Sequence, residues 1–267
     1  MRMRFARATA LLALLGLSPV LFAQTVAKPQ ALKPQAQAHV PDLSGVWEET
    51  IGTEGWNTND PAGLKTEDGT PYLPAALALT KAHSSGHGLN ASDVSNTDAV
   101  VLNCDPPGVP RLALYPHPLR IIQTPSEVLI LYEATKMWRE IYLDGRTLPS
   151  NLDPTWFGYS VGHYEGGALV VETAGERADT WLDNVGRPHS DALHIVERFS
   201  RPDTHTLRID VTFDDPKMYA KPWSGSKTWR LSPPGAKGDL QESICAISDQ
   251  LHFEEQVVNP ATNGKAR

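Results

Sequence analysis

A series of short β-patterned runs separated by turn residues constrains the fold of this 267-residue chain more than any other feature. Turns rich in glycine, proline and aspartate separate the runs, as in the loop Glu165-Gly166-Gly167. The runs are Leu119–Gln123, Glu127–Glu133, Met137–Leu143, Val161–Tyr164, Ala168–Thr173, Ala192–Arg198, Thr206–Asp214, Lys227–Leu231, Glu242–Ile247 and His252–Glu254. Hairpin spacing with almost no helix predicts a meander, which removes its exposed edges best by closing. We therefore expect an all-β fold, an antiparallel β-barrel formed by a single domain over residues 40–255.

The N-terminal segment has the pattern of a secretory signal peptide. Arginines at positions 2, 4 and 7 precede an apolar stretch over residues 8–17, and a small-residue cleavage site ends at Ala23. No later run approaches the ~20 apolar residues that a membrane span needs. We expect a signal peptide over residues 1–23, a disordered tether over 24–39, a flexible tail over 256–267, and a periplasmic or secreted protein without a membrane span.

The segment between Gly52 and Val100 is rich in Gly, Pro, Asn and Asp and is unusually long for a loop within one domain. A short helix is expected over Leu77–Ala82, starting near Pro74. Such an insertion is often a lid or a binding loop.

Charge and motifs limit the partners. The formal net charge is −7, which makes nucleic acid and anionic lipid poor partners. The sequence has no Gly-rich phosphate loop, which argues against a nucleotide, and we expect no cofactor. The predicted partner is a small-molecule ligand or substrate.

The chain has two cysteines, Cys104 and Cys245. An even count in an oxidising compartment favours a disulfide between them. The long loop that it closes corresponds to about 4–5 kcal/mol in the entropic description.

The ordered part opens with Gly45-Val46-Trp47, a Gly-x-Trp at the start of the first strand. This motif resembles the lipocalin and calycin signature, in which the Trp closes one end of a barrel beneath an Arg from the last strand. Arg230, in Thr228-Trp229-Arg230-Leu231, matches that Arg. The resemblance implies a lipocalin-like barrel, and the alternative is an ordinary Trp in the core.

Several further motifs resemble a large family of secreted, mostly uncharacterised bacterial proteins. Tyr159 and Tyr164 depart from that pattern, in which His and Trp are common at these positions. The resemblance covers nearly all of the ordered chain and implies a single domain. The matching segments are Cys104 to Arg111, Gln123-Thr124-Pro125, Arg139 to Arg146, Gly158 to Gly166, His189 to Phe199, and Asp215-Pro216 with Pro222-Trp223.

Two charged residues fall on strand faces that are otherwise apolar. Glu197 shares a face with Leu193, Ile195 and Phe199, and Arg139 shares one with Met137 and Ile141. A buried carboxylate is either paired or serves as an acid or base. A buried Arg serves a ligand or pairs with a carboxylate, and the candidate partners of Arg139 are Glu127, Glu133 and Glu197.

Three histidines are candidate acid–base groups. His163 is a plausible cross-strand neighbour of Glu172, although a rim salt bridge would look the same. His189 and His194 flank the start of a strand. These histidines could also bind a metal, but their spacing is not that of a metal motif. We expect the catalytic set His163, His189, His194, Glu197 and Arg139 to converge on one cavity, with structural ion pairs as the alternative.

Aromatic and acidic residues in loops complete the predicted site. Loop aromatics at a barrel mouth suit stacking on a sugar or an aromatic ring, or they fill the end of the barrel. The expected substrate-binding residues are Tyr159, Trp181, Asp183, Asp191, Tyr219 and Trp223.

The predicted function is cofactor-free acid–base catalysis of the lyase, isomerase or hydrolase type on a small sugar-like or phenolic compound. Two alternatives remain open: a non-catalytic periplasmic binding protein for such a compound, and a metal-dependent enzyme that uses histidines. A Ser–His–Asp triad in His189-Ser190-Asp191 is not expected, because adjacent residues rarely reach one another in that arrangement.

Overall fold

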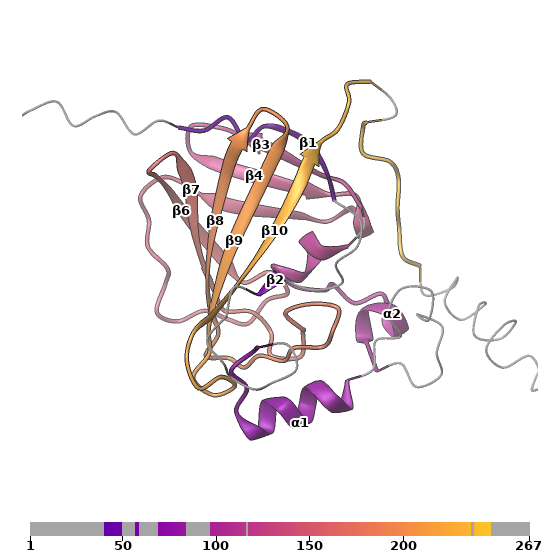
Figure 1. Ribbon diagram of the computed structural model, residues 1–267, viewed down its shortest axis with the longest axis vertical. Helices are drawn as coiled ribbons and strands as arrows, with labels where there is room; N and C mark the ends of the chain where they lie inside the picture. Colours follow the sequence, from indigo (N-terminus) through magenta and orange to yellow (C-terminus); the bar gives the residue numbers. More distant parts are fainter. Residues whose placement is uncertain are drawn as a thin grey trace, which may run out of the picture. The chain divides into compact units, whose positions relative to one another are not determined.

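A computed structural model describes residues 40–49, 57–58, 69–83, 97–115, 117–235 and 238–246. These residues form a ten-stranded sheet in the order β1-β3-β4-β5-β6-β7-β8-β9-β10-β2, and β1 also pairs with β10. Every strand except β2 therefore belongs to a closed ring, which confirms the expected all-β barrel (Figure 1). The strands are β1 (Gly45–Glu49), β2 (Asn57–Thr58), β3 (Leu119–Gln123), β4 (Glu127–Tyr132), β5 (Trp138–Tyr142), β6 (Tyr159–Glu165), β7 (Ala168–Ala174), β8 (His194–Asp203), β9 (Thr206–Asp214) and β10 (Trp223–Leu231).

The barrel is mixed rather than purely antiparallel. Strands β5 and β6 pair in parallel through Tyr142 and Val161, and the other pairings are antiparallel. A parallel pair needs a connection longer than a hairpin turn, and residues 143–158 supply it. The expectation of an antiparallel barrel is therefore wrong at this one step.

The barrel interior is apolar because inward and outward residues alternate along each strand. The long strands β8 and β9 show this alternation in their burial. The same alternation turns Arg139 and Glu197 inward, as the sequence predicted. Buried aliphatic and aromatic side chains fill the remaining space, among them Val128, Ile130, Ile141, Val171, Ile195, Phe199, Ile209 and Val211.

Trp47 is part of the buried core, but the arginine over its ring is not the expected one. Trp47 is fully buried, and its indole N–H donates to Leu43 O at 2.9 Å. The guanidinium of Arg201, at the end of β8, lies 5.3 Å from the ring centroid. Arg230 instead pairs with Glu48 on the surface, at 3.4 Å. Gly45 has φ +144°, and a Cβ there would lie 2.9 Å from Leu231 Cδ1, so the Gly of the motif is required.

Substituting Arg201 with Ala is expected to lower the free energy of unfolding by about 1–2 kcal/mol. The substitution removes the cation over Trp47 and the hydrogen bonds to Asp42 O and Thr204 O. The matched control is Arg230→Ala, which should cost less than about 0.5 kcal/mol because its ion pair is exposed. Urea denaturation measures both, and equal losses would contradict the assignment of Arg201.

Two α-helices lie in the described part of the long insertion between β1 and β3, and Figure 1 shows α1 beneath the lower ends of β8–β10. Helix α1 (Pro74–Ala82) contains the predicted helix and starts at Pro74, where proline fits the first helical position. Helix α2 (Ala99–Asn103) was not predicted, and Asp98 caps it by accepting from Val100 N–H. The disulfide Cys104–Cys245 is present, with a Cα–Cα distance of 5.5 Å, which confirms that prediction.

The C-terminal strand predictions are only partly tested. Residues 242–246 of the run Glu242–Ile247 are not in a strand, so that prediction is wrong over the described part. The run His252–Glu254, the signal peptide, the tether and the tail lie outside the described residues. Among the helices that are described, none has the length and apolar character that crossing a membrane needs.

Candidate functional site

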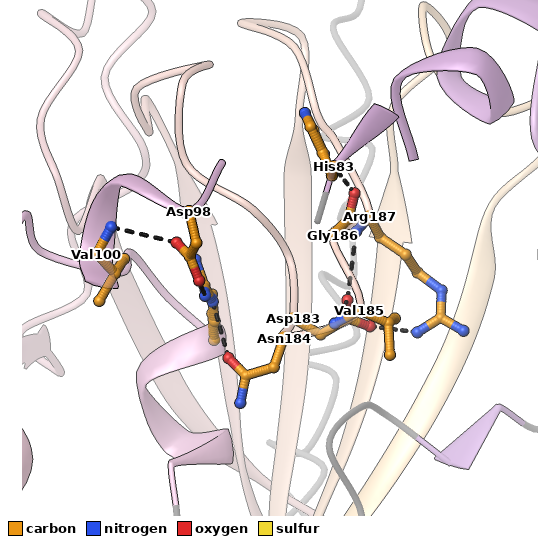
Figure 2. A network of polar contacts seen from close by, with 9 residues as sticks. His83, Asp98, Val100, Asp183, Asn184, Val185, Gly186 and Arg187 are labelled. Carbon is orange, nitrogen blue, oxygen red and sulfur yellow. Dashed lines mark hydrogen bonds and ion pairs between the residues drawn. The ribbon is translucent and has the colours of Figure 1, made fainter. Parts of the chain in front are cut away.

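The connection between β7 and β8, residues 175–193, is held from within by Asp183. Its carboxylate is fully buried, pairs with the guanidinium of Arg187, and accepts from the backbone N–H groups of Val185 at 3.1 Å and Arg187 at 3.3 Å (Figure 2). Arg187 Nε donates to Thr70 Oγ1 at 3.1 Å. Asp183 was expected to bind substrate. In the structure its carboxylate instead fixes the conformation of this connection through contacts within the protein.

A second buried ion pair attaches the same connection to the insertion. Arg111 pairs with Asp98, and Arg111 Nε donates to Asn184 Oδ1 at 3.0 Å. His83, just after α1, has Nδ1 2.7 Å from Gly186 O (Figure 2). Its ring also stacks on Trp181, at 4.4 Å between centroids. The described parts of the insertion thus pack against the β7–β8 connection, although the two are far apart in sequence.

A cleft of about 460 Å³ opens between α1 and the β7–β8 connection. Its apolar wall comes from Leu79, Trp181 and Met218, and its polar groups include two residues of the predicted site, His189 and Asp191. The lining residues are Leu79, His83, Ala178, Asp179, Thr180, Trp181, Pro188, His189, Ser190, Asp191 and Met218.

His189 is the titratable group most closely held in this cleft, with 2% of its surface exposed. Its Nδ1 lies 3.1 Å from Ser190 O, and because a carbonyl can only accept, Nδ1 carries the proton. Nε2 is then an acceptor, and it lies 2.7 Å from the hydroxyl of Thr180, which also contacts Arg177 O at 3.0 Å. Burial lowers the pKa of His189 below 6.5, opposed by the bond to Ser190 O and the charge of Asp215. The imidazole is therefore neutral at neutral pH, and its basic nitrogen, Nε2, faces the hydroxyl of Thr180.

Ser190 and Asp191, which follow His189, do not extend it into a triad. Ser190 Oγ donates to Asp215 Oδ1 at 2.8 Å, and its N–H donates to the other oxygen of the same carboxylate at 2.6 Å. Asp191 is exposed at the rim and pairs with Lys217, whose hydrogen bond lowers the pKa of Asp191. The structure thus agrees with the expectation that these three adjacent residues form no triad.

The other two histidines lie on the outer surface of the barrel. His163 is exposed and stands 3.7 Å from Glu165. The register pairs His163 with Val170, so Glu172 faces His194 instead, with His194 Nε2 3.2 Å from Glu172 Oε2. The prediction that His163 and Glu172 are partners is therefore wrong. The prediction that the three histidines converge on one cavity is also wrong.

Arg139 and Glu197 meet inside the barrel, where each side chain is 2% exposed. Arg139 Nη1 donates to Glu197 Oε1 at 3.1 Å, and Nη2 contacts the second carboxylate oxygen. The remaining donors reach Thr173 Oγ1 at 2.8 Å and Ser160 Oγ at 3.1 Å. Burial alone would lower the pKa of Arg139, but the charge and hydrogen bonds of Glu197 raise it. This is the structural ion pair that the sequence left as an alternative.

Of the predicted aromatic residues, Trp181 lines the cleft and the others do not. Tyr219 is buried behind it, where its hydroxyl donates to Pro188 O at 2.6 Å and burial raises its pKa. Trp223 stacks on Phe213 in the core at 4.3 Å. Tyr159 lies outside this region and accepts from Arg146 Nη1 at 2.9 Å.

Sequence reasoning missed Thr180 and His83, which also line the cleft. Thr180 lies in Ala178-Asp179-Thr180-Trp181, a stretch without periodicity, and nothing in it marks the hydroxyl as the partner of His189. His83 lies directly after α1, in a stretch of sequence that carries no motif.

No family model, curated protein or solved structure matches this chain. The resemblances to the lipocalins and to secreted bacterial proteins therefore stay predictions. Within the described ranges, no group of three or more His, Cys, Asp or Glu side chains is arranged to hold a metal ion.

Proposed function

We propose that the protein is a secreted, lipocalin-like barrel enzyme that performs cofactor-free acid–base chemistry on a small sugar-like or phenolic compound. The N-terminal pattern supports secretion, and Trp47 beneath Arg201 supports a lipocalin-like barrel end. The reaction takes place in the cleft between α1 and the β7–β8 connection, and the barrel interior serves as the scaffold.

The observation that carries this proposal is the neutral His189 in the wall of the cleft. A general base needs an unprotonated nitrogen at neutral pH and a fixed orientation. Burial lowers the pKa of His189, and the bond from Nδ1 to Ser190 O fixes the tautomer. The histidine thus has both properties before any substrate binds.

The lining of the cleft supports a small, amphipathic substrate. Its volume of about 460 Å³ is within the usual range for ligand pockets. Leu79, Trp181 and Met218 provide apolar contact for a phenol ring or a sugar face, and the carboxylate of Asp179 can accept from hydroxyl groups.

The substitution His189→Asn is expected to reduce turnover of p-nitrophenyl acetate by about 10²-fold or more. The Asn amide can replace the Nδ1–H donor to Ser190 O, while the basic nitrogen is lost. In the wild type, activity should rise with pH through a midpoint below 6.5, because the base must be deprotonated. Release of p-nitrophenol, followed by absorbance across a pH series, measures both.

The matched control is His194→Asn, a histidine on the outer surface whose loss should leave turnover unchanged. If both variants retain wild-type turnover and melting temperature, His189 is not the base. Binding of p-nitrophenol in the cleft without turnover of the ester would instead indicate the non-catalytic binding protein. That alternative has some support, because His189, Thr180 and Ser190 all have partners within the protein.

A further inference from the structure

Thr180 occupies a position that the proposed base alone does not explain. Its hydroxyl lies 2.7 Å from His189 Nε2 and 3.0 Å from Arg177 O, and both are acceptors. A hydroxyl has one proton, so it can satisfy only one of them at a time. When the proton is directed at Nε2, the oxygen of Thr180 is hydrogen-bonded to a neutral imidazole, which is the arrangement of an activated nucleophile.

We propose that Thr180 is the nucleophile of this site and that the substrate is a small acyl ester of a phenol or sugar. This inference rests on the proposed function, because it uses His189 as the base. Thr180 Oγ forms a bond to the ester carbonyl carbon while its proton passes to His189 Nε2. The bond to the leaving oxygen then breaks, and that oxygen takes the proton from the imidazolium. Water, activated by the same nitrogen, hydrolyses the acyl-threonine and restores the hydroxyl.

The neighbouring hydroxyl does not fit this role. Ser190 Oγ donates to Asp215 and accepts from Ala192 N–H at 3.1 Å, so its proton and a lone pair are both in use. Among the described residues, no imidazole nitrogen bonds to Ser190 Oγ, whereas Thr180 contacts one directly. Among the two hydroxyls that line the cleft, the geometry therefore selects Thr180.

The surroundings of Thr180 define the shape of the substrate. Thr180 and Trp181 line both the large cleft and a second cavity of about 80 Å³. Arg111 and Trp156 also line this smaller cavity. An ester whose carbonyl carbon lies at Thr180 would place its small acyl group in the smaller cavity and its phenol or sugar in the cleft. Acetyl esters fit this division, and bulky acyl groups do not.

Acid quenching of the wild type during turnover of p-nitrophenyl acetate, followed by peptide mass spectrometry, tests the covalent step. The expected result is an acetyl group on Thr180. Diisopropyl fluorophosphate should label the same residue. An acetyl or phosphoryl group on another residue, or on none, would overturn the proposal whatever the behaviour of the variants.

Variants provide an independent readout. Thr180→Val removes the hydroxyl at nearly constant volume and should reduce turnover by about 10²-fold or more, while Thr180→Ser should retain it within about 10-fold. Thr212→Val is the matched control, since Thr212 pairs with Ser224 on the barrel strands and should be dispensable. The ratio of p-nitrophenyl acetate to p-nitrophenyl decanoate turnover should strongly favour the acetate.

The outcomes separate this inference from the proposed function. If Thr180→Val retains turnover and His189→Asn loses it, His189 activates water directly, and the assignment of Thr180 as the nucleophile is wrong. If both variants retain turnover, both proposals fail. Loss in both variants, with an acetyl group on wild-type Thr180, supports both.

Discussion

Replacing Glu197 with Leu is expected to lower the free energy of unfolding by about 3–5 kcal/mol. The carboxylate is 2% exposed inside the barrel, where it forms two contacts with the guanidinium of Arg139. Its removal would leave that guanidinium buried without a counter-charge, and the hydroxyls of Ser160 and Thr173 cannot replace one. Urea denaturation of the wild type and the variant measures the loss.

The double variant Arg139→Met/Glu197→Leu separates the cost of an unpaired charge from the value of the pair. It should recover most of the lost stability, because an apolar pair of similar volume often replaces a buried ion pair without penalty. Ser160 and Thr173 would still bond to each other, at 3.0 Å in the present structure. Asp210→Asn is the control, since the Arg208–Asp210 pair is partly exposed and its loss should cost less than about 1 kcal/mol. A double variant no more stable than Glu197→Leu would contradict this explanation.

Strand alternation made the interior of the barrel predictable. A period of two placed Arg139 and Glu197 on inward faces without knowledge of the neighbouring strands. It could not give the register, because register depends on the turns between strands, and here Glu172 lies opposite Val161 on β6 and Val196 on β8. The partner of Glu172 was assigned to the wrong histidine for that reason.

The candidate site was less predictable, because it is built from connections. His189 was recognised by its residue type, but its contact with Thr180 depends on the fold of residues 175–193. That fold is determined by Asp183 and by contacts with a distant insertion. Arg201 shows the same limit at the other end of the barrel, where the course of β8 brings a different arginine over Trp47. Local patterns contain no information on such contacts.

Glu176, just after β7, is a buried acid. The sequence patterns did not single it out, and it has no role in the proposed mechanism. Val109 N–H donates to its Oε1 at 2.7 Å, and its Oε2 has no hydrogen-bond partner among the described residues. Gly158 packs against it, and with φ +60° a Cβ at that glycine would lie 3.0 Å from Glu176 Cγ. Burial raises the pKa of Glu176 from 4.5 to about 8, and the bond from Val109 and the charge of Arg139 oppose this only in part.

The raised pKa of Glu176 predicts a loss of stability with rising pH. Between about pH 5 and pH 8 the folded state keeps a proton on Glu176 that the unfolded state has released, so the free energy of unfolding falls as the pH rises. Glu176→Gln keeps an acceptor for Val109 N–H and cannot ionise. Compared with the wild type, the variant should therefore gain on the order of 3–5 kcal/mol between about pH 5 and about pH 9.

Urea denaturation of both proteins across this pH range tests the prediction, because other groups titrate in both and cancel in the difference. Glu172→Gln is the matched control, since Glu172 lies on β7, four residues before Glu176, is partly exposed and pairs with His194. Its pH dependence should follow that of the wild type through the range near pH 8. If Glu176→Gln also follows the wild type there, Glu176 is ionised in the folded protein at neutral pH. Water or a cation would then have to solvate Oε2, since no hydrogen-bond donor among the described residues reaches it.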